Sequence, residues 1–192
     1  MNVEYPIIIK KVLPDSKFYS LRDEFNYAGW KLENYSYKGG GENDKISWML
    51  NESNNKLIMY ECASIIKLKI QKYLKQDLIL IKVHSNGATV GQTQKFHIDF
   101  DKDDIWTFVL FTEENWNTQW GGEFVSFDPI NNTYKYTPFM PNSGALIPSN
   151  WEHYGAAPND YTDNLRTTMA FSYSSLQSFD CIKNSPTVRS FL

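Results

Sequence analysis

Several features that mark particular classes of protein are scarce in this sequence or missing from it. Its 192 residues include two cysteines, Cys62 and Cys181, which lie far apart and without metal-site spacing, so a reducing intracellular compartment is expected. The first residues, Met1 to Pro6, lack the charged-then-apolar order of a signal peptide, and no apolar run approaches membrane-spanning length. We therefore expect a cytoplasmic protein without a membrane partner.

Strong positive charge is also missing. The formal net charge is -3, which gives no polycationic footprint for nucleic acid. Lysines do gather between residues 67 and 75, but on a predicted helix such a group is more often a solvated face. The 42% of hydrophobic residues and the length suit one packed domain with a sizeable core. No internal repeat indicates a second domain, and the pattern does not indicate an oligomeric state.

Residues 1–77 are predicted to form a helical and hairpin support. The β-branched run Tyr5–Ile9 predicts a strand, residues 15–29 a helix, and residues 30–55 a hairpin with a glycine-containing loop. No Gly-Lys-Ser/Thr follows these glycines, so a flexible loop is favoured over a phosphate loop. The longest helical pattern covers about 53–75 and predicts a helix that backs a sheet. Its expected core-facing stripe is Leu57, Tyr60, Ala63 or Ser64, Ile66 or Leu68, Ile70 and Tyr73-Leu74.

After Asp77 the pattern changes to short strands separated by turn residues. The predicted strands are Leu78–His84, Lys95–Asp99, Ile105–Thr112, Glu123–Phe127, Thr133–Thr137, Ala145–Ile147, Glu152–Tyr154 and Leu165–Tyr173. Eight short strands without intervening helices argue against a parallel doubly wound sheet and favour a two-sheet jelly roll. The predicted fold is mainly β with N-terminal helices: a double-stranded β-helix, cupin-like core at 78–175, within a single domain spanning 1–192. Residues 176–192 are expected to form an irregular tail.

The tripeptide His97-Ile98-Asp99 is the first candidate for chemistry. On a strand, His97 and Asp99 share one face, and Ile98 with the flanking phenylalanines takes the other in a hydrophobic layer. The sequence has three histidines, and His153 follows the pair on a later predicted strand. Two histidines and one carboxylate form a facial triad that fills one face of an octahedral metal and leaves the other open. His-x-Asp alone is a weak signal, because it occurs by chance in many chains.

Arg166 is the second candidate. The alternation of the last predicted strand places Arg166 and Thr168 on its small, polar face. An arginine that points into a barrel is costly unless an anion pairs with it. A carboxylate co-substrate would accept two parallel hydrogen bonds from the guanidinium, with Thr168 as a further donor. A salt bridge to a protein carboxylate is the alternative, and Arg166 taken alone favours that alternative.

Taken together, His97-x-Asp99, then His153, then Arg166 resemble the Fe(II)/2-oxoglutarate-dependent oxygenases, and most closely their prolyl 4-hydroxylase-like branch. The segment Trp120-Gly121-Gly122-Glu123-Phe124 is similar to that branch's Gly-Gly-Glu strand start. Residues 141–148 (Pro-Asn-Ser-Gly-Ala-Leu-Ile-Pro) resemble its Pro-x-x-Gly turn and strand before the distal histidine. The similarity covers about residues 55–175, and the motifs are far more specific jointly than singly.

This resemblance implies Fe(II) held by His97, Asp99 and His153, with 2-oxoglutarate as co-substrate paired with Arg166 and assisted by Thr168. It implies O2 as oxidant, ascorbate as an optional addition, and succinate and CO2 as by-products. The implied reaction is hydroxylation of an unactivated C–H bond, most closely of a prolyl residue in a peptide or protein. A free amino acid or another small molecule is the alternative substrate.

The sequence departs from the family pattern at several points. Arg166 stands where prolyl hydroxylases often have lysine, and His84 stands in the place of a tyrosine that helps to hold 2-oxoglutarate. His84 is therefore a candidate for contact with co-substrate or substrate, with a structural histidine as the alternative. The branch that repairs alkylated nucleic acid usually has a second arginine where this chain has Ser172, and halogenases lack the carboxylate that Asp99 supplies. Hydroxylation without a nucleic-acid partner is expected.

Two other functions are compatible with the same candidate site residues. A cupin-like metalloenzyme that does not use 2-oxoglutarate would keep the triad but would not need Arg166. A non-catalytic jelly-roll binding module would use all of these residues structurally. For the oxygenase, a loop that closes over the site is expected at Tyr35–Lys45 or Gly87–Lys95.

Overall fold

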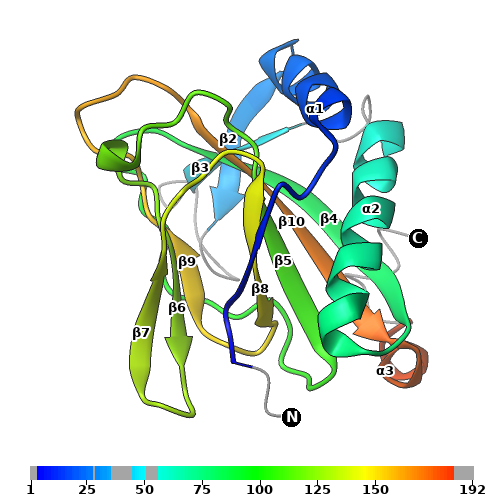
Figure 1. The fold of residues 1–192 in the computed structure, drawn as a ribbon. Helices are drawn as coiled ribbons and strands as arrows, with labels where there is room; N and C mark the ends of the chain where they lie inside the picture. The colour runs from blue at the N-terminus through cyan, green and yellow to red at the C-terminus, as the bar shows by residue number, and fades with distance from the viewer. Residues whose placement is uncertain (1–3, 28, 36–44, 51–55, 184–192) are drawn as a thin grey trace.

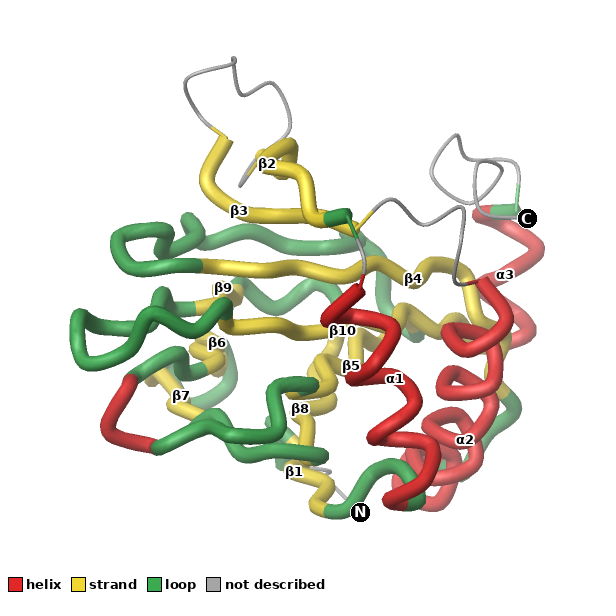
Figure 2. The backbone as a smooth tube through the Cα atoms, turned by 90° about the horizontal axis from the view of Figure 1, so that it is seen from above, coloured by secondary structure: helices red, strands yellow, loops and turns green. Residues whose placement is uncertain are grey.

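A computed structural model describes residues 4–27, 29–35, 45–50 and 56–183 of the chain. Helices α1 (Asp15–Tyr27) and α2 (Lys56–Leu74) cover one face of a seven-stranded sheet, and a three-stranded sheet lies on the other side (Figure 1). The view from above shows the same layers, with the helices and the small sheet on opposite sides (Figure 2). Among the described helices, none has the length and apolar character that a membrane crossing requires.

The large sheet has the strand order β1-β8-β5-β10-β4-β3-β2, and the small sheet has the order β7-β6-β9. The large sheet consists of β1 (Ile7–Lys10), β8 (Ser143–Pro148), β5 (Ile105–Phe111), β10 (Arg166–Ser175), β4 (Leu78–Ala88), β3 (Lys45–Leu50) and β2 (Trp30–Tyr35). The small sheet consists of β7 (Thr133–Thr137), β6 (Phe124–Asp128) and β9 (His153–Gly155). Neighbouring strands are antiparallel throughout. The predicted mainly-β, two-sheet jelly roll with N-terminal helices is confirmed.

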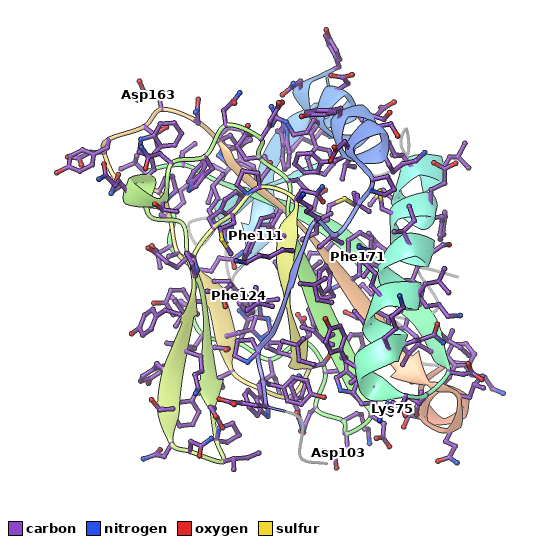
Figure 3. The ribbon with its side chains drawn as sticks, viewed as in Figure 1. Lys75, Asp103, Phe111, Phe124, Asp163 and Phe171 are labelled. Carbon is purple, nitrogen blue, oxygen red and sulfur yellow. The ribbon has the colours of Figure 1, made fainter. Side chains whose placement is uncertain are left out.

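Strand β10 shows how the large sheet separates two environments. Met169, Phe171 and Tyr173 join the apolar core on the helix side, together with residues of α2. Thr168 and Ala170 alternate with them and face the space between the sheets. Figure 3 shows this division, with Phe171 on the helix side and Phe124 of β6 towards the small sheet. Strand β5, next to β10, is buried at every residue, as expected for a central strand.

Helix α2 backs the sheet as predicted, but through a partly different face. The side chains buried against the sheet are Met59, Cys62, Ala63, Ile66 and Ile70. The members of the predicted stripe that are exposed instead are Leu57, Tyr60, Leu68 and Tyr73. Apolar residues occupy much of the circumference of α2, so two stripes with helical spacing compete for the sheet. Tertiary packing selects one of them.

The N-terminal part contributes strands to the core as well as supporting it. Strand β1 pairs with β8, with Ile8 opposite Ala145, and it begins two residues later than the predicted strand. Strand β3 pairs with β4 through Trp48 and Gly87, so the predicted hairpin extends the large sheet. The glycine loop of that hairpin, and the first residues of the predicted long helix, lie outside the described residues.

Residues 95–99 were predicted as a strand, and the structure corrects this. They form a single bridge, between His97 and His153, beyond the last strand of the small sheet. Phe96 and Ile98 are 40% and 41% exposed, and the ring of Phe96 packs against Tyr154 with centroids 4.6 Å apart, so the predicted hydrophobic layer forms only in part. The physical reason is position: an outer segment has solvent on its far face and one neighbour to pair with.

Two other boundaries also differ from the prediction. Strand β4 continues through Asn86 and Gly87, which were expected to form a turn. The predicted irregular tail begins with helix α3 (Leu176–Ile182), which follows β10 directly. Its cap is Ser175, whose side chain accepts a hydrogen bond from the Ser178 amide at 3.2 Å.

Candidate active site

A cavity lies between the two sheets and has a volume of about 360 Å³, with the open space at its mouth included. Strands of both sheets and the segment 94–99 contribute its walls. The lining residues are His84, Asn86, Gln94, His97, Asp99, Thr107, Val109, Phe124, His153, Gly155, Arg166, Thr168 and Ala170. The structure therefore brings all six residues selected from the sequence into one cavity.

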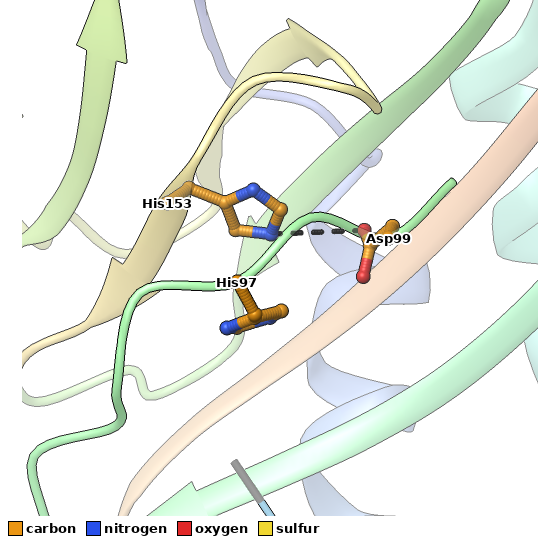
Figure 4. Close-up of side chains that lie close together, drawn as sticks. All are labelled: His97, Asp99 and His153. Atoms are coloured by element: carbon orange, nitrogen blue, oxygen red, sulfur yellow. Dashed lines mark ion pairs between the residues drawn. The ribbon is translucent and has the colours of Figure 1, made fainter. Parts of the chain in front are cut away.

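At one end of the cavity, His97, Asp99 and His153 converge. Each offers one ligand atom, and these atoms all lie within 4.8 Å of one another. Nε2 of His153 is 3.7 Å from Oδ2 of Asp99, and the two imidazole centroids are 4.6 Å apart (Figure 4). The main chains of His97 and His153 exchange hydrogen bonds of 3.1 and 2.9 Å, which holds the two segments together. This is the donor set and the spacing of a divalent-metal site.

Hydrogen bonds outside this cluster orient its three side chains. In both histidines Nδ1 bonds to the carbonyl oxygen two residues earlier, at 3.0 Å for His97 and 2.9 Å for His153. A carbonyl can only accept, so Nδ1 carries the proton in each ring, and Nε2 is left with its lone pair towards the shared centre. Asp99 Oδ2 accepts a hydrogen bond of 2.6 Å from Thr107 Oγ1. Outer partners of this kind fix the ligands of protein-bound metals.

The protonation states suit metal binding. Burial raises the pKa of the Asp99 carboxyl, but the electrostatic effects of His153, His84 and Lys82 and the hydrogen bond from Thr107 together outweigh it and lower the pKa to about 2. Burial lowers the pKa of His153, and it lowers the pKa of His84 to about 3. The cluster therefore holds an ionised carboxylate and a neutral buried imidazole near pH 7, which are the forms that bind a metal.

Arg166 lies at the other end of the cavity and is 4% exposed. Its Nε donates to the Gly122 carbonyl at 2.6 Å, and its Cζ lies 5.2 Å from the centre of the Phe139 ring. Nη2 is buried without a hydrogen-bond partner, and among the described residues no carboxylate lies within 4.0 Å of the guanidinium. Burial lowers the pKa of Arg166 to about 10, so it stays charged at neutral pH. These surroundings fit an anionic ligand better than the alternative of a protein salt bridge.

Two glycines keep space open around the guanidinium. A Cβ on Gly122 would lie 3.0 Å from Cδ of Arg166, and a Cβ on Gly155 would lie 3.2 Å from Nη1. Gly122 also has a φ of 81°, a conformation that other residues rarely adopt. The Gly-Gly of the sequence motif thus provides both room for Arg166 and the backbone bend that begins β6.

Cross-strand pairing places the remaining candidates between these two ends. Thr168 lies opposite Asn86, and Ala170 lies opposite His84. The cavity-facing residues of β10 therefore lead from Arg166 through Thr168 to Ala170, whose cross-strand partner His84 is close to the metal-ligand candidates. Nδ1 of His84 is buried and unpartnered, and the charges of Asp99 and both other histidines affect its pKa. His84 is therefore a neutral polar group with a free nitrogen close to the triad.

Seven of the lining residues were not selected from the sequence, and three of these seven have polar side chains: Asn86, Gln94 and Thr107. Asn86 shares a face with His84, but the Asn-Gly pair had indicated a turn there. Thr107 lies on a strand that is apolar apart from this residue, and a polar residue inside such a strand is a usable signal. Gln94 had no signal, because its place in the cavity depends on long-range pairing with Gly155.

The segment Gly87–Lys95, one of the two predicted closing loops, is held by several contacts. Gln92 Oε1 accepts hydrogen bonds from the Thr89 amide at 2.7 Å and from Trp48 Nε1 at 3.1 Å. The other predicted loop, Tyr35–Lys45, lies almost wholly outside the described residues. The segment Gly87–Lys95 therefore contacts the cavity through Gln94 and the hairpin strand β3 through the bond between Gln92 and Trp48.

No family model matches the sequence, and no curated protein matches it. Solved structures do match the fold. An oxidoreductase of the 2OG-Fe(II) oxygenase family from Burkholderia pseudomallei is 10% identical, with 88% of this chain and 83% of that chain covered at a TM-score of 0.67. A prolyl hydroxylase in complex with a hypoxia inducible factor oxygen degradation domain peptide fragment, from Trichoplax adhaerens, is 15% identical over 92% and 86% of the two chains, with a TM-score of 0.66. HygX from Streptomyces hygroscopicus, with nickel, 2-oxoglutarate and hygromycin B bound, is 10% identical over 88% and 82%, with a TM-score of 0.62.

These likenesses show that the chain has the fold of the 2OG-Fe(II) oxygenases, prolyl hydroxylase structures among them. The resemblance inferred from the sequence motifs is confirmed for the fold. On that fold, one end of the cavity holds the metal-ligand candidates His97, Asp99 and His153, and the other end holds the buried cation of Arg166.

Proposed function

We propose that this protein is an Fe(II)- and 2-oxoglutarate-dependent dioxygenase that hydroxylates an unactivated C–H bond and releases succinate and CO2. The observation that carries the proposal is that one cavity holds both the His97, Asp99 and His153 cluster and the buried guanidinium of Arg166, whose Nη2 has no hydrogen-bond partner. When bound, iron and 2-oxoglutarate supply the oxidation chemistry, and the protein supplies binding, orientation and enclosure. We also propose that residues 1–192 form a single oxygenase domain of a cytoplasmic protein.

In this proposal His97, Asp99 and His153 hold the metal. Their free donor atoms face one centre, and their other polar atoms are fixed by hydrogen bonds. These three residues would hold a divalent ion and would leave it coordination positions for co-substrate and O2.

Arg166 binds the distal carboxylate of 2-oxoglutarate through its free Nη2, and Thr168 lies on the same wall of the cavity as a further donor. His84 contributes its unpartnered nitrogen next to the metal centre, where it can hydrogen-bond to the co-substrate. Since His84 is neutral, it adds a hydrogen bond without adding a competing positive charge. Ascorbate is proposed as an optional reductant that keeps the iron in its ferrous form.

For the substrate we propose a prolyl residue in a peptide or protein. The support is the sequence motifs of the prolyl hydroxylase branch and the fold shared with a prolyl hydroxylase that was crystallised with a peptide. The alternative is a small molecule, supported by the same fold in HygX with hygromycin B bound. A fold can host many substrates, so the substrate must be tested directly.

The test is consumption of 2-oxoglutarate by the Fe(II)-loaded protein across proline-containing peptides, free amino acids and other small molecules, with mass detection of one added oxygen. We expect turnover with a prolyl peptide, and we expect His97→Ala to abolish it. Turnover with a small molecule only would contradict the prolyl substrate. Metal binding without any 2-oxoglutarate consumption would favour a metalloenzyme of another kind, and absence of metal binding would favour a binding module.

A further inference from the structure

Gln94 reaches the cavity from the segment that follows β4, and two hydrogen bonds fasten it to the end of β9. Its backbone amide donates to the Gly155 carbonyl at 3.2 Å, and its side-chain Oε1 accepts from the Gly155 amide at 3.1 Å. The carboxamide is therefore held in one orientation, with its oxygen committed to the main chain. Within the described part of the chain, no acceptor bonds to the Nε2 of Gln94.

The side chain of Gln94 shares a small space with the guanidinium. The position that a Cβ would take on Gly155 is 3.2 Å from Gln94 Oε1, 3.2 Å from Arg166 Nη1 and 3.4 Å from Nη2. Because residue 155 is glycine, that position is empty, and the carboxamide and the guanidinium face the same gap. The gap is thus bordered by the guanidinium of Arg166, whose Nη2 is buried without a partner, and by the carboxamide of Gln94. The oxygen of that carboxamide is already bonded to the Gly155 amide, so its NH2 group is the part left to donate to a ligand.

From this geometry we infer that Gln94 is a second binding residue for the distal carboxylate of 2-oxoglutarate and acts together with Arg166. This inference rests on the proposed function. A carboxylate has two oxygens and can accept from both side chains at once, one oxygen facing the guanidinium and the other the carboxamide. Gln94 also links co-substrate binding to the segment Gly87–Lys95, because the same residue belongs to that segment and to the gap.

A purely structural role makes a different prediction. If Gln94 only fastens β9, Gln94→Ala will weaken the binding of 2-oxoglutarate and of a keto acid without the distal carboxylate by the same factor, and that result would overturn the inference. Gln94→Glu is the stronger perturbation of the gap: it retains the acceptor oxygen but replaces the NH2 donor by a negatively charged oxygen. That oxygen would pair with Arg166 and repel the incoming carboxylate.

The experiment measures binding of 2-oxoglutarate to the Ni(II)-loaded protein by calorimetry, so the readout does not depend on turnover. We expect Gln94→Glu to weaken 2-oxoglutarate binding by about tenfold or more, the scale of one lost charge-assisted hydrogen bond. We expect its affinity for 2-oxopentanoate, which lacks the distal carboxylate, to stay unchanged. The thermal midpoint of the metal-free protein should not fall, because the new carboxylate gives the buried guanidinium a partner.

Gln92→Glu is the matched control, since Gln92 lies in the same segment but does not line the cavity; it should leave both affinities unchanged. Gln94→Ala serves if Gln94→Glu fails to fold, and it should also weaken binding of 2-oxoglutarate more than that of 2-oxopentanoate. Equal 2-oxoglutarate affinity in wild type and Gln94→Glu would overturn the inference alone. A wild-type protein that binds Ni(II) but not 2-oxoglutarate would instead overturn the proposed function.

Discussion

Thr107 donates a hydrogen bond of 2.6 Å to Asp99. This threonine is the only polar residue of β5, and its bond supports the metal-ligand cluster. Its hydroxyl proton is used in that bond, so Ser149, whose Oγ is 2.9 Å away, must donate to it. The result is a relay of two hydroxyl groups that ends on one carboxylate oxygen of the cluster. Asp99 is thereby kept ionised and in one rotamer before any ligand arrives.

Thr107→Val should weaken metal binding by about tenfold, the usual scale for loss of an outer partner of a metal ligand. The change preserves the shape of the side chain and removes only the hydroxyl, so the fold should be retained. Calorimetric titration with Ni(II) or Fe(II) measures the effect. Thr112→Val is the control, because Thr112 bonds to Thr167 and does not line the cavity. Equal metal affinity in Thr107→Val and wild type would contradict the supporting role of the relay.

Gly155→Ala should raise the concentration of 2-oxoglutarate needed for turnover while leaving metal affinity unchanged. The new methyl group would lie 3.2 Å from Nη1 of Arg166 and 3.2 Å from Oε1 of Gln94, within the gap assigned to the carboxylate. Gly29→Ala is a suitable control, since a Cβ there has no atom within 4 Å. The measurement is the apparent affinity for 2-oxoglutarate at saturating Fe(II), and an unchanged value would argue that the carboxylate binds elsewhere.

Arg22 of α1 and Glu113, which follows β5, form an ion pair with side chains 10% and 14% exposed. Glu113→Gln should destabilise the protein by about 3 kcal/mol, because the largely buried guanidinium loses its close counter-charge and keeps only Glu114, whose Oε2 lies 4.0 Å from Nε of Arg22. Urea unfolding followed by fluorescence measures this difference. Glu61→Gln, which breaks the exposed pair with Lys17, should leave the unfolding midpoint close to that of wild type. Similar midpoints for the two variants would show that the Arg22 pair does not stabilise the fold.

Cys62 should be unreactive while the protein is folded. Burial against the sheet raises the pKa of its thiol to about 12, so at pH 8 only about one molecule in ten thousand carries the thiolate that reacts with alkylating agents. In a Cys181→Ser background, iodoacetamide should label the folded protein far more slowly than the urea-unfolded protein. The raised pKa also means that the stabilising contribution of this group is present below pH 9 and is lost as the pH rises towards 12. Fast labelling of the folded protein would contradict the burial of Cys62.

Much of the site could be predicted from the sequence because its chemistry needs rare residue types in a fixed order. With three histidines in the chain, His97, Asp99 and His153 were identifiable before their distances were known, and Arg166 stood out as a charge on the polar face of a strand. Gln94 and Gly155 could not be found in this way. Their role depends on two segments meeting across 61 residues of sequence, and neither residue type is unusual.

For the fold, too, elements with a strong local sequence pattern could be predicted, and features that depend on long-range packing could not. Strand β5 has an almost wholly apolar sequence and was predicted as a strand, and alternation identified both faces of β10. Helix α2 presented two apolar stripes, and only packing on the sheet selects the one that contains Cys62 and Ile66. The strand expected at residues 95–99 is reduced to one bridge because its pairing partner is three residues long.

The position of β10 has a consequence for how the protein is made. This strand comes last among the strands of the described residues, yet it lies in the middle of the large sheet, between β5 and β4. During synthesis the two halves of that sheet have no connecting strand until Ser175 has left the ribosome. Until then the edges of β5 and β4 that pair with β10 have no partner strand, and unpaired edges of this kind favour aggregation of an incomplete chain. Folding of the large sheet and assembly of the cavity are thus late, coupled events.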